Sequence, residues 1–476
     1  MTPSDPKYRA ALAIAQTLRD AGAQAFFAGG CVRDLLLGVI PKDYDVATSA
    51  APDQVVGLFP KTVAVGAHFG VILVCQTVSD ENAAGADIEI ATEVATFRND
   101  GAYSDGRRPD AVRFSADARE DVLRRDFTIN GMLLDPLAYE ATAGDAAAAV
   151  IDYVHGREDL AAGIIRAIGD ARLRFAEDKL RMLRAARFAA RLNYRIEDST
   201  AAAIHCHAAD IHQVSQERVR DELTRILTEG GASRGFDLLY SLGLLARVLP
   251  EVVRLRGVAQ PPEFHPEGDV WVHTMLLLER LPPGCSVTLA WGALLHDIGK
   301  PATYQPPNPK VPGDRIRFNG HVEVGVRIAE EILARLRFSN EDAAQIIALV
   351  KNHMRFGDLL EMRESTRKRF LRLPRFDEHL ELHRLDVESA HGDLTLYDFA
   401  CQHYGDDPAE ELRPAPLLTG RDLIAAGYRP SPQFKVMLTL AEDAQLEHAA
   451  TTREEALALV QERFPLIPAV PPKAAS

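Results

Sequence analysis

Between positions 29 and 45 the sequence has two glycines that could bind phosphate and two aspartates that could bind metal ions. Gly29 and Gly30 follow a short apolar run, 25–28, and precede a helical pattern, so free backbone N–H groups could face an anion such as phosphate. Asp43 and Asp45 lie two residues apart. In an extended segment both carboxylates would point to one face, with Cα atoms about 6–7 Å apart. Such a pair can bridge two Mg²⁺ ions about 3.5–4 Å apart, as in in-line nucleotidyl transfer.

Each half of this stretch has a simpler explanation by itself. A Gly-Gly pair often forms only a turn, and an Asp-x-Asp pair in a loop is often solvated or forms an Asx turn. The spacing gives them more weight, because Gly-Gly-Cys-Val-Arg-Asp at 29–34 is followed by Lys-Asp-Tyr-Asp at 42–45. This combination resembles the first motif of the family of class II tRNA nucleotidyltransferases and bacterial poly(A) polymerases.

The elements around this stretch fit a small sheet that carries acids at one edge. Apolar residues recur at helical spacing over 8–20, which predicts a helix that covers one side of the sheet. A further helix and three strands are expected at 50–59, 63–65, 71–78 and 86–97. Together these elements fit a polymerase-type palm.

A third carboxylate in the strand at 86–97 would help to hold a second metal ion. The family has a Glu-Val-Ala-Thr-x-Arg element, which this sequence matches at 93–98, so the resemblance implies Glu93. Glu89 lies four residues earlier and would share the same face of a regular strand. The choice between Glu93 and Glu89 stays open, and an exposed strand acid without a chemical role is the simpler alternative.

Residues 99–109 have the Gly, Asp, Asn and Pro content of a mobile loop, and Arg107 and Arg108 are available there for phosphate. In the family this loop helps the enzyme to change from C to A addition, and enzymes restricted to C lack it. The resemblance therefore implies an enzyme that adds A.

Residues 121–132 closely match the family motif that joins the catalytic head to the neck. Arg124 and Arg125 could neutralise triphosphate oxygens, while Asp126 and Asn130 could fix the joint or bind ribose. The residues expected to hold the triphosphate are Gly29, Gly30, Arg33, Arg124 and Arg125.

Residues 177–192 are predicted to form a helix in which Asp178, Arg181 and Arg184 recur every third residue and share one face. A salt bridge is the simpler account of this spacing. Alternatively, a carboxylate accepts a hydrogen bond from the exocyclic amino group that C and A share, and arginine donates to the ring acceptors. The resemblance to the family's Glu-Asp-x-x-Arg-x-x-Arg motif implies that these side chains template the incoming nucleotide.

A second set of candidate ligands follows a Pro-rich stretch at 260–266. Imidazole and carboxylate groups suit a divalent transition metal such as Ni²⁺ or Mn²⁺, with a water left for attack on phosphate. The set matches the ligands of an HD-type metal phosphohydrolase and consists of His273, His296, Asp297 and Asp386.

His321 and His353 could complete a second metal position in this region or bind the substrate phosphate. The resemblance to HD domains implies reactions on 2′,3′-cyclic phosphates, 2′-nucleotides or phosphate monoesters. Alternatively, the HD domain has no hydrolase activity and serves in tRNA binding or dimerisation.

The composition narrows the class of protein. The chain has 476 residues, 47% of them hydrophobic, and a net charge of -14 that argues against a protein coated by nucleic acid. A local basic stretch at 166–195 is either an RNA-backbone track or a solvated helix face. Five scattered cysteines without C-x-x-C spacing argue against a disulfide or zinc framework. Without a secretion signal or an apolar run of membrane-spanning length, a cytoplasmic protein with no membrane partner is expected.

The predicted fold class is α+β: an N-terminal nucleotidyltransferase palm, with a small mixed β-sheet and helices, precedes an all-α neck and an all-α HD domain. An Ala-rich insert at 141–150 is predicted to be a linker or surface loop. The predicted domains are a head at 1–140, a helical templating and RNA-binding neck at 141–250, an HD domain at 260–400, and a helical tail with a disordered end at 410–476.

The resemblance spans nearly the whole chain and implies a CCA-adding tRNA nucleotidyltransferase. Asp43 and Asp45 would hold two Mg²⁺ ions, and tRNA, CTP, ATP and a second copy of the chain are the expected partners. A poly(A) polymerase or A-adding enzyme shares every motif, although the HD domain favours CCA addition. A phosphohydrolase or RNA-binding regulator with an inert head is a further alternative, against which the intact Asp43, Asp45, Arg125 and Asp178 speak.

Overall fold

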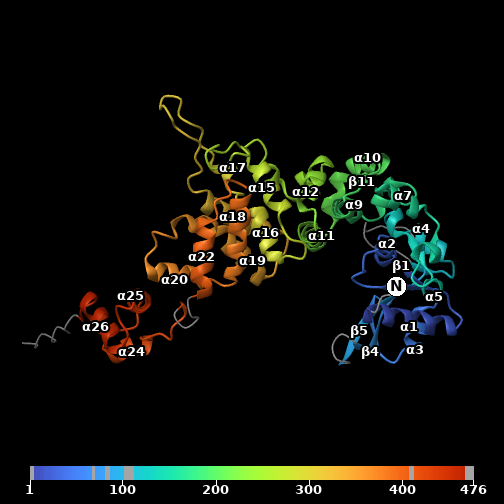
Figure 1. Ribbon diagram of the computed structural model, residues 1–476, viewed down its shortest axis with the longest axis horizontal. Coiled ribbons are helices and arrows are strands. Elements are labelled where there is room, and N and C mark those ends of the chain that lie inside the picture. Colours follow the sequence, from blue (N-terminus) through green and yellow to red (C-terminus); the bar gives the residue numbers. More distant parts are fainter. Residues whose placement is uncertain (1–4, 67–69, 81–85, 101–111, 407–411, 467–476) are drawn as a thin grey trace, which may run out of the picture. The chain divides into compact units, whose positions relative to one another are not determined.

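The computed structural model describes residues 5–66, 70–80, 86–100, 112–406 and 412–466. The chain forms two compact units. The first comprises Met1–Val253 with Pro282–Gly284 and Arg335–Arg337, and the second comprises Arg254–Leu281, Cys285–Ala334 and Phe338–Ser476. In Figure 1 the colours run from blue to green over the sheet-bearing first unit and then from yellow to red.

A seven-stranded mixed sheet forms the base of the first unit, with strand order β3-β4-β5-β2-β1-β8-β9. Only β2 and β5 are parallel neighbours, and the other pairs in the sheet are antiparallel. The strands of this sheet are β1 (Ala25–Ala28), β2 (Asp45–Thr48), β3 (Thr62–Gly66), β4 (Val71–Asp80), β5 (Ala86–Thr96), β8 (Met132–Leu134) and β9 (Val150–Asp152). Two further pairs join β6 (Arg98–Asp100) to β7 (Val112–Phe114) and β10 (Ile164–Ile165) to β11 (Arg195–Ile196).

Helix α1 (Pro6–Asp20) covers the sheet and contacts β1, β2, β4 and β5. It begins where Asp5 accepts a hydrogen bond from the backbone N–H of Lys7 at 2.9 Å, which satisfies one of the unpaired N–H groups of the first turn. Tyr8, Ile14 and Leu18 are among the side chains that its apolar face buries. This packing covers the part of the sheet that contains β2 and β5.

Helices complete the first unit: α2 to α6 lie between the strands of the main sheet in the sequence, and α7 to α14 follow β9. They are α2 (Gly30–Leu36), α3 (Pro52–Leu58), α4 (Ala118–Leu123), η3 (Thr128–Asn130), α5 (Pro136–Ala141), α6 (Ala146–Ala149), α7 (Gly156–Ala162), α8 (Ala171–Glu177), α9 (Leu180–Arg191), α10 (Asp198–His207), η4 (Ala208–Gln213), α11 (Gln216–Thr228), α12 (Ala232–Ser241), α13 (Leu245–Val248) and α14 (Pro250–Val253).

The second unit is helical over the residues that the structure describes, apart from isolated bridges. Helix α16 packs between α15, α19 and α21 and buries every side chain from Thr288 to Leu295. The elements are α15 (Val270–Glu279), α16 (Val287–Leu295), α17 (Lys300–Thr303), α18 (His321–Arg335), α19 (Asn340–Asn352), η5 (His353–Asp358), α20 (Glu364–Leu371), α21 (Phe376–Glu388), α22 (Thr395–Asp406), α24 (Gly420–Ala425), α25 (Gln433–Leu446) and α26 (Arg453–Arg463).

The predicted fold class is therefore confirmed: a mixed sheet with helices precedes a mostly helical remainder. Among the described helices none is both long and apolar enough to cross a bilayer.

Two local predictions were wrong. The insert at 141–150 is not a linker, because it contains α6 and leads directly into β9, a strand of the main sheet. The helix predicted over 177–192 is interrupted at Asp178, whose backbone is extended with φ −139° and ψ 105°. The Asp178 carboxylate accepts the N–H of Leu180 at 3.0 Å, and this capping interaction starts a new helix, α9.

The loop predicted at 99–109 is described only at its start. Asn99 and Asp100 belong to β6, whereas Arg107 and Arg108 lie outside the described residues, as does the chain end at 467–476.

Candidate functional site

The parallel pairing of β2 with β5 brings two predicted carboxylates together on one face of the sheet. Val46 pairs with Val94, so the preceding residues, Asp45 and Glu93, lie side by side on the opposite face. Val46 and Val94 are fully buried, while Asp45 and Glu93 are exposed. Glu89 lies four residues back along β5, opposite Thr77, where it forms an ion pair with Lys61. The register thus places Glu93, and not Glu89, beside Asp45.

The carboxylate of Asp45 is in a strongly negative environment. Although the residue is exposed, the atoms packed around its carboxyl group take that group partly out of water. This desolvation, together with the charges of Glu93 and Asp43, raises the pKa of Asp45 to about 6, against the opposing charge of Arg125. Carboxylate oxygens crowded in this way are the donor set that Mg²⁺ prefers. The carboxylate oxygens of the three acids are therefore suitable ligands for a divalent cation.

Asp43 reaches the site from the segment before β2. Its side chain is 66% exposed and forms an ion pair of 2.9 Å with Nζ of Lys7. Tyr44, between the two aspartates, is buried, which is the alternation expected for an extended segment. The carboxylates of Asp43 and Asp45 thus lie on the solvent-exposed face of the sheet, as predicted for an extended segment.

The predicted phosphate cradle is a tight turn between β1 and α2. Gly29 has a φ of +79°, a conformation that other residues rarely adopt. A Cβ atom at Gly29 would lie 3.3 Å from Nη1 of Arg125, so the guanidinium borders this turn. The first turn of α2, which begins at Gly30, and Arg125 therefore present N–H groups to the same region.

Arg124 and Arg125 are both held by Asp121, which the sequence analysis did not single out. Arg124 Nε donates to Oδ1 of Asp121 at 3.0 Å, and Arg125 Nη2 donates to Oδ2 at 2.9 Å. Asp121 is buried, which would raise the pKa of its carboxyl group, but Arg125 and Arg124 lower that pKa below its ordinary value. Asp121 therefore orients both cations, and only its place as the first residue of the 121–132 motif could have suggested this role.

Four of the predicted nucleotide-binding residues form one buried chain of hydrogen bonds. Arg33 Nη1 donates to Oδ1 of Asn130 at 2.7 Å, and Asn130 Nδ2 donates to Asp126 at 3.4 Å. Arg184 Nε donates to the other oxygen of Asp126 at 2.8 Å. Burial would raise the pKa of Asp126, but the charge and hydrogen bonds of Arg184 lower it. The chain joins α2, η3 and α9 into a single structure.

The three residues of the predicted base-reading face have different partners within the chain. Asp178 accepts from Nη2 of Arg218 at 2.8 Å, and Arg181 donates to Glu177 at 2.7 Å and to the carbonyl of Arg124 at 2.9 Å. Arg184 points instead to Asp126. The prediction of one shared helical face was wrong because Asp178 precedes α9 as its cap.

Arg218 on α11 was missed. The helix carries three arginines, Arg218, Arg220 and Arg225, and nothing in their spacing distinguishes one of them. Most of the basic stretch at 166–195 is likewise engaged in ion pairs within the chain, formed by Arg166, Arg174, Arg181, Arg184, Arg187 and Arg191.

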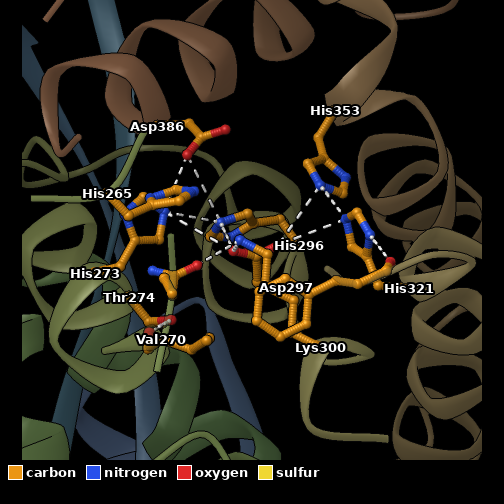
Figure 2. A network of polar contacts seen from close by, with 12 residues as sticks. His265, Val270, His273, Thr274, His296, Asp297, Lys300, His321, His353 and Asp386 are labelled. Atoms are coloured by element: carbon orange, nitrogen blue, oxygen red, sulfur yellow. Dashed lines mark hydrogen bonds and ion pairs between the residues drawn. The ribbon is translucent and has the colours of Figure 1, made fainter. Parts of the chain in front are cut away.

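In the second unit, the predicted HD residues converge from α15, the segment after α16, α18, η5 and α21 (Figure 2). Nε2 of His273 lies 3.0 Å from Oδ1 of Asp386 and 3.3 Å from Nε2 of His296. These three residues offer ligand atoms within 4.8 Å of one another, a spacing that one metal ion can span. They form the first ligand group.

His321 and His353 form the second ligand group with Asp297. Their Nε2 atoms are 3.4 Å apart and lie 3.8 and 3.7 Å from Oδ1 of Asp297. The other oxygen of Asp297, Oδ2, lies 3.3 Å from Nε2 of His296 in the first group. Asp297 therefore stands between the two groups, as Figure 2 shows.

Backbone contacts orient the histidines. Nδ1 of His296, His321 and His353 lies 2.8, 2.9 and 2.7 Å from a carbonyl oxygen three residues earlier in the chain. This contact fixes the proton on Nδ1 and leaves Nε2 as a free ligand atom, which is the usual arrangement of metal-binding histidine. Both groups thus fit a divalent transition metal by their donor set.

Gly299 and Lys300, which follow the His296-Asp297 segment, stabilise the arrangement of the two ligand groups. A Cβ on Gly299 would collide with the backbone oxygen of His321, so only glycine lets α18 approach the His296-Asp297 segment. Lys300 Nζ lies 2.6 Å from Oδ2 of Asp297. Burial would raise the pKa of Asp297, but Lys300 and His296 hold that pKa well below its ordinary value.

His273 has a second carboxylate partner that the sequence analysis missed. Oε1 of Glu267 lies 2.8 Å from Nδ1 of His273 and 2.8 Å from Nδ1 of His265. Burial would lower the pKa of His273, but Asp386 and Glu267 raise it to about 9. A glutamate six residues before a ligand, in a segment without helical periodicity, gave no signal in the sequence.

A cavity of about 650 Å³ opens beside both ligand groups. His321, His353 and Asp386 line it together with cationic and aromatic side chains such as Lys300 and Phe318. The metal-ligand groups therefore adjoin a space large enough for a small organic phosphate.

Comparison with protein families matches three parts of the chain in order. Residues 25–166 match the poly A polymerase head domain, 193–255 match the "probable RNA and SrmB- binding site of polymerase A", and 269–373 match the HD domain. A nucleotidyltransferase head and an HD domain both imply binding of divalent metal ions.

Known CCA-adding enzymes resemble this chain in sequence. The enzyme of Geobacillus sp. (strain WCH70) is 41% identical over 237 residues, which are 50% of this chain and 54% of that enzyme. The chain thus spans about half the length of the first curated relatives that it matches. The enzyme of Latilactobacillus sakei is 37% identical over 289 residues, which cover 59% of this chain and 67% of that enzyme.

The fold extends the likeness to almost the whole chain. The crystal structure of the Bacillus stearothermophilus CCA-adding enzyme in complex with CTP superposes with a TM-score of 0.67 at 26% identity and covers 96% of this chain and 98% of that one. The resemblance seen in the sequence motifs is therefore confirmed. The chain belongs to the family of CCA-adding enzymes, and it carries an HD domain behind the poly(A) polymerase head.

Proposed function

We propose that this chain adds C, C and A from CTP and ATP to the 3′ end of tRNA. The observation that carries the proposal is the parallel pairing of β2 with β5, which sets Asp45 beside Glu93 on the face that also bears Asp43. Family membership supports the same reaction, because the relatives are CCA-adding enzymes and one of them was crystallised with CTP.

Asp43, Asp45 and Glu93 would hold two Mg²⁺ ions. When bound, these ions would activate the 3′-hydroxyl of tRNA and neutralise charge on the triphosphate. The raised pKa of Asp45 supports this assignment, since the carboxylates repel one another and a cation would relieve that repulsion.

The turn at Gly29, the start of α2 at Gly30, and Arg33 would hold the triphosphate with Arg124 and Arg125. Arg125 uses Nε and Nη2 on Asp121, so its Nη1, which borders the Gly29 turn, is directed to the cradle. Arg33 and Asn130 are bonded to each other, and this bond would fix the helix that carries the cradle.

Asp178 and Arg181 would choose the base. Asp178 would accept a hydrogen bond from the exocyclic amino group of C or A, and Arg181 would donate to the ring acceptor. Both side chains keep intramolecular partners in the structure, Arg218 for Asp178 and Glu177 for Arg181, so these partners would orient them toward the base. Arg184 would act through Asp126, at the joint between head and neck.

The rival reaction is addition of A alone, or poly(A) synthesis. The test uses one tRNA that ends before the two C residues and one that ends after them, each with CTP and ATP supplied separately. We expect C on the shorter tRNA and A on the longer one. Failure to incorporate C on the shorter tRNA would overturn the proposal, and unchanged incorporation by Asp43→Ala would overturn the metal assignment.

We also propose that the HD domain hydrolyses small phosphate esters such as 2′,3′-cyclic phosphates and 2′-nucleotides. The supporting observation is the position of Asp297 between the two ligand groups, beside a cavity. His273, His296, Asp297 and Asp386, with His321 and His353, would hold Ni²⁺ or Mn²⁺, which would activate a water for attack on phosphorus.

The test of this second activity is hydrolysis of 2′,3′-cyclic AMP by the full chain loaded with Mn²⁺ or Ni²⁺. We expect His296→Ala to abolish hydrolysis and to spare CTP incorporation. Loss of both activities would contradict two separate sites, and absence of hydrolysis in the unmodified protein would leave the alternative of a domain for tRNA binding or dimerisation. The predicted homodimer and cytoplasmic location stay predictions, which light scattering and cell fractionation can test.

A further inference from the structure

The four histidines of the two ligand groups differ in what contacts their Nδ1 atoms. Nδ1 of His296, His321 and His353 contacts a backbone carbonyl oxygen. Nδ1 of His273 instead lies 2.8 Å from Oε1 of Glu267, a carboxylate. The side chain of His273 is 0% exposed and that of Glu267 is 6% exposed, so this contact is shielded from water. The first ligand group thus contains the one histidine of the four whose Nδ1 is held by an acidic side chain.

Glu267 has a second imidazole partner. Its Oε1 accepts a hydrogen bond from Nδ1 of His265 at 2.8 Å. The rings of His265 and His273 meet edge to face, with centroids 4.9 Å apart and planes inclined by 80°, and they lie next to each other in Figure 2. A buried carboxylate is costly unless polar partners surround it. The two imidazoles are therefore the groups that offset the burial of Glu267.

A closed loop presents Glu267 to the start of α15. The N–H of Gln260 donates to the carbonyl of Gly268 at 2.9 Å, which joins the two ends of the loop. The next residue, Asp269, caps α15 and accepts hydrogen bonds from the first N–H groups of that helix. The loop that carries Glu267 is thus tied directly to the helix that carries His273.

The two ligand groups otherwise offer the same donors. Each consists of two imidazoles and one carboxylate, so the type and number of these ligands do not distinguish them. A partner on Nδ1 fixes the ring of a ligand histidine and raises the basicity of Nε2, and its loss typically weakens metal binding about 10- to 100-fold. A hydrogen bond to an ionised acceptor is roughly twice as strong as one to a neutral acceptor. A carboxylate partner therefore favours the first ligand group over the second.

We propose that Glu267 is a positioning residue of the HD domain: it orients His273, strengthens Nε2 of that ring as a metal ligand, and makes the first ligand group the tighter of two metal positions. The inference rests on the metal centre of the proposed function and adds an order of filling to it. At limiting metal the first ligand group is occupied before the second. His265 acts behind Glu267, because its N–H holds the carboxylate in place.

The test measures Mn²⁺ binding to the full chain by calorimetry and by electron paramagnetic resonance. Every protein carries Asp43→Ala and Asp45→Asn, so that the head does not contribute bound ions. Two backgrounds then isolate the ligand groups: His321→Ala leaves the first group intact, and His273→Ala leaves the second group intact.

In each background the parent is compared with Glu267→Ala, Glu267→Gln and the control Glu263→Ala, which changes an exposed glutamate of the same loop. With His321→Ala, Glu267→Ala should raise the Kd for Mn²⁺ about 10- to 100-fold. Glu267→Gln keeps an acceptor oxygen but not the charge, so its Kd should lie between those of Glu267→Ala and the parent. With His273→Ala, none of the three changes should alter the Kd of the remaining ion, because Glu267 acts through His273.

Equal losses in both backgrounds would overturn the inference, since they would show that Glu267 supports the fold of the region and not His273. An unchanged Kd in the His321→Ala background would overturn the positioning role. If Glu267→Ala does not fold, the same comparison with Glu267→Gln decides. With both groups intact, survival of the tighter ion in His273→Ala would overturn the order of filling.

Hydrolysis of 2′,3′-cyclic AMP by the unmodified protein is measured alongside. Binding in the expected order without hydrolysis would refute the hydrolase proposal alone and support the role of Glu267. Absence of Mn²⁺ from this centre in the unmodified protein would overturn the inference together with the metal assignment.

Discussion

Arg33 and Asn130 are hydrogen-bonded across 97 positions of the chain, with Nη1 of Arg33 2.7 Å from Oδ1 of Asn130. Both residues are buried. Arg33 belongs to the helix of the phosphate cradle, and Asn130 belongs to the 121–132 motif, which leads into β8. Two separate sequence motifs thus form one rigid structure at the proposed triphosphate site.

Replacement of Asn130 by Ala removes the acceptor of Nη1 of Arg33, while Nε and Nη2 keep their bonds to Asp34. Because a buried donor without a partner is costly, we expect the free energy of unfolding to fall by about 1–3 kcal/mol. The kcat/KM for CTP should fall about 10-fold, since a shift of the cradle by a fraction of an ångström misplaces the triphosphate. Urea unfolding and steady-state kinetics measure the two effects. The exposed Asn340→Ala is the control, and equal behaviour of the two variants would contradict the role of this bond.

Replacement of Asp45 by Asn should stabilise the metal-free head while it abolishes nucleotide incorporation. The pKa of Asp45 is raised to about 6 in the folded chain, so folding favours the protonated form and the carboxylate costs stability as the pH rises through that value. Because Asp45 is also exposed to solvent, we expect only about 1 kcal/mol in EDTA at about pH 8, and less at about pH 5.

Thermal unfolding in EDTA and in Mg²⁺ checks this prediction. Mg²⁺ should stabilise the unmodified protein and have a smaller effect on Asp45→Asn. A variant that unfolds at a lower temperature than the parent at about pH 8 would show that Asp45 has a structural role instead.

Among the described residues, Arg218 is the one cation that contacts the Asp178 carboxylate. Replacement of Arg218 by Gln should therefore release this carboxylate. A charge-assisted hydrogen bond is worth about 1.5–3 kcal/mol, so we expect the kcat/KM for CTP and ATP to fall about 10-fold or more. UTP should be incorporated relatively better, because a mobile Asp178 discriminates less between bases. Arg220→Gln, on the same helix but paired with Asp221, is the control. Equal losses in both variants would point to damage of α11 as a whole.

Replacement of Lys300 by Met should make the stability of the HD domain depend on metal. Lys300 lies 2.6 Å from buried Asp297, and removal of one partner of a buried ion pair costs about 3–5 kcal/mol. A divalent ion supplies the missing positive charge, so Mn²⁺ should raise the unfolding temperature more in this variant than in the parent. Calorimetry with EDTA and with Mn²⁺ measures the difference. The exposed Lys310→Met should respond like the parent.

The sequence contained enough to predict the fold class, because amphipathic periodicity and β-branched runs are local properties. It could not choose between Glu93 and Glu89, since both have the same strand periodicity. Only the register between β2 and β5, a relationship between distant segments, separates them. The predicted helical face of Asp178 and Arg181 failed for a related reason, because the capping preference of aspartate outweighed a continuous helical pattern.

The sequence also could not predict which residues of distant elements would contact the site residues. Arg218 and Glu267 contact predicted residues only after the helices pack, and neither belongs to a recognisable spacing. The motifs thus identified the groups that carry charge, and packing determined which neighbours hold them.

The position of Asp297 between the two ligand groups has a consequence for metal stoichiometry. A substitution at His273 or at His321 removes a ligand from one group only, whereas a substitution at Asp297 removes a neighbour of both. If each group holds one ion, counting the ions retained per chain would therefore distinguish the residues that contact one ion from Asp297, which would contact both.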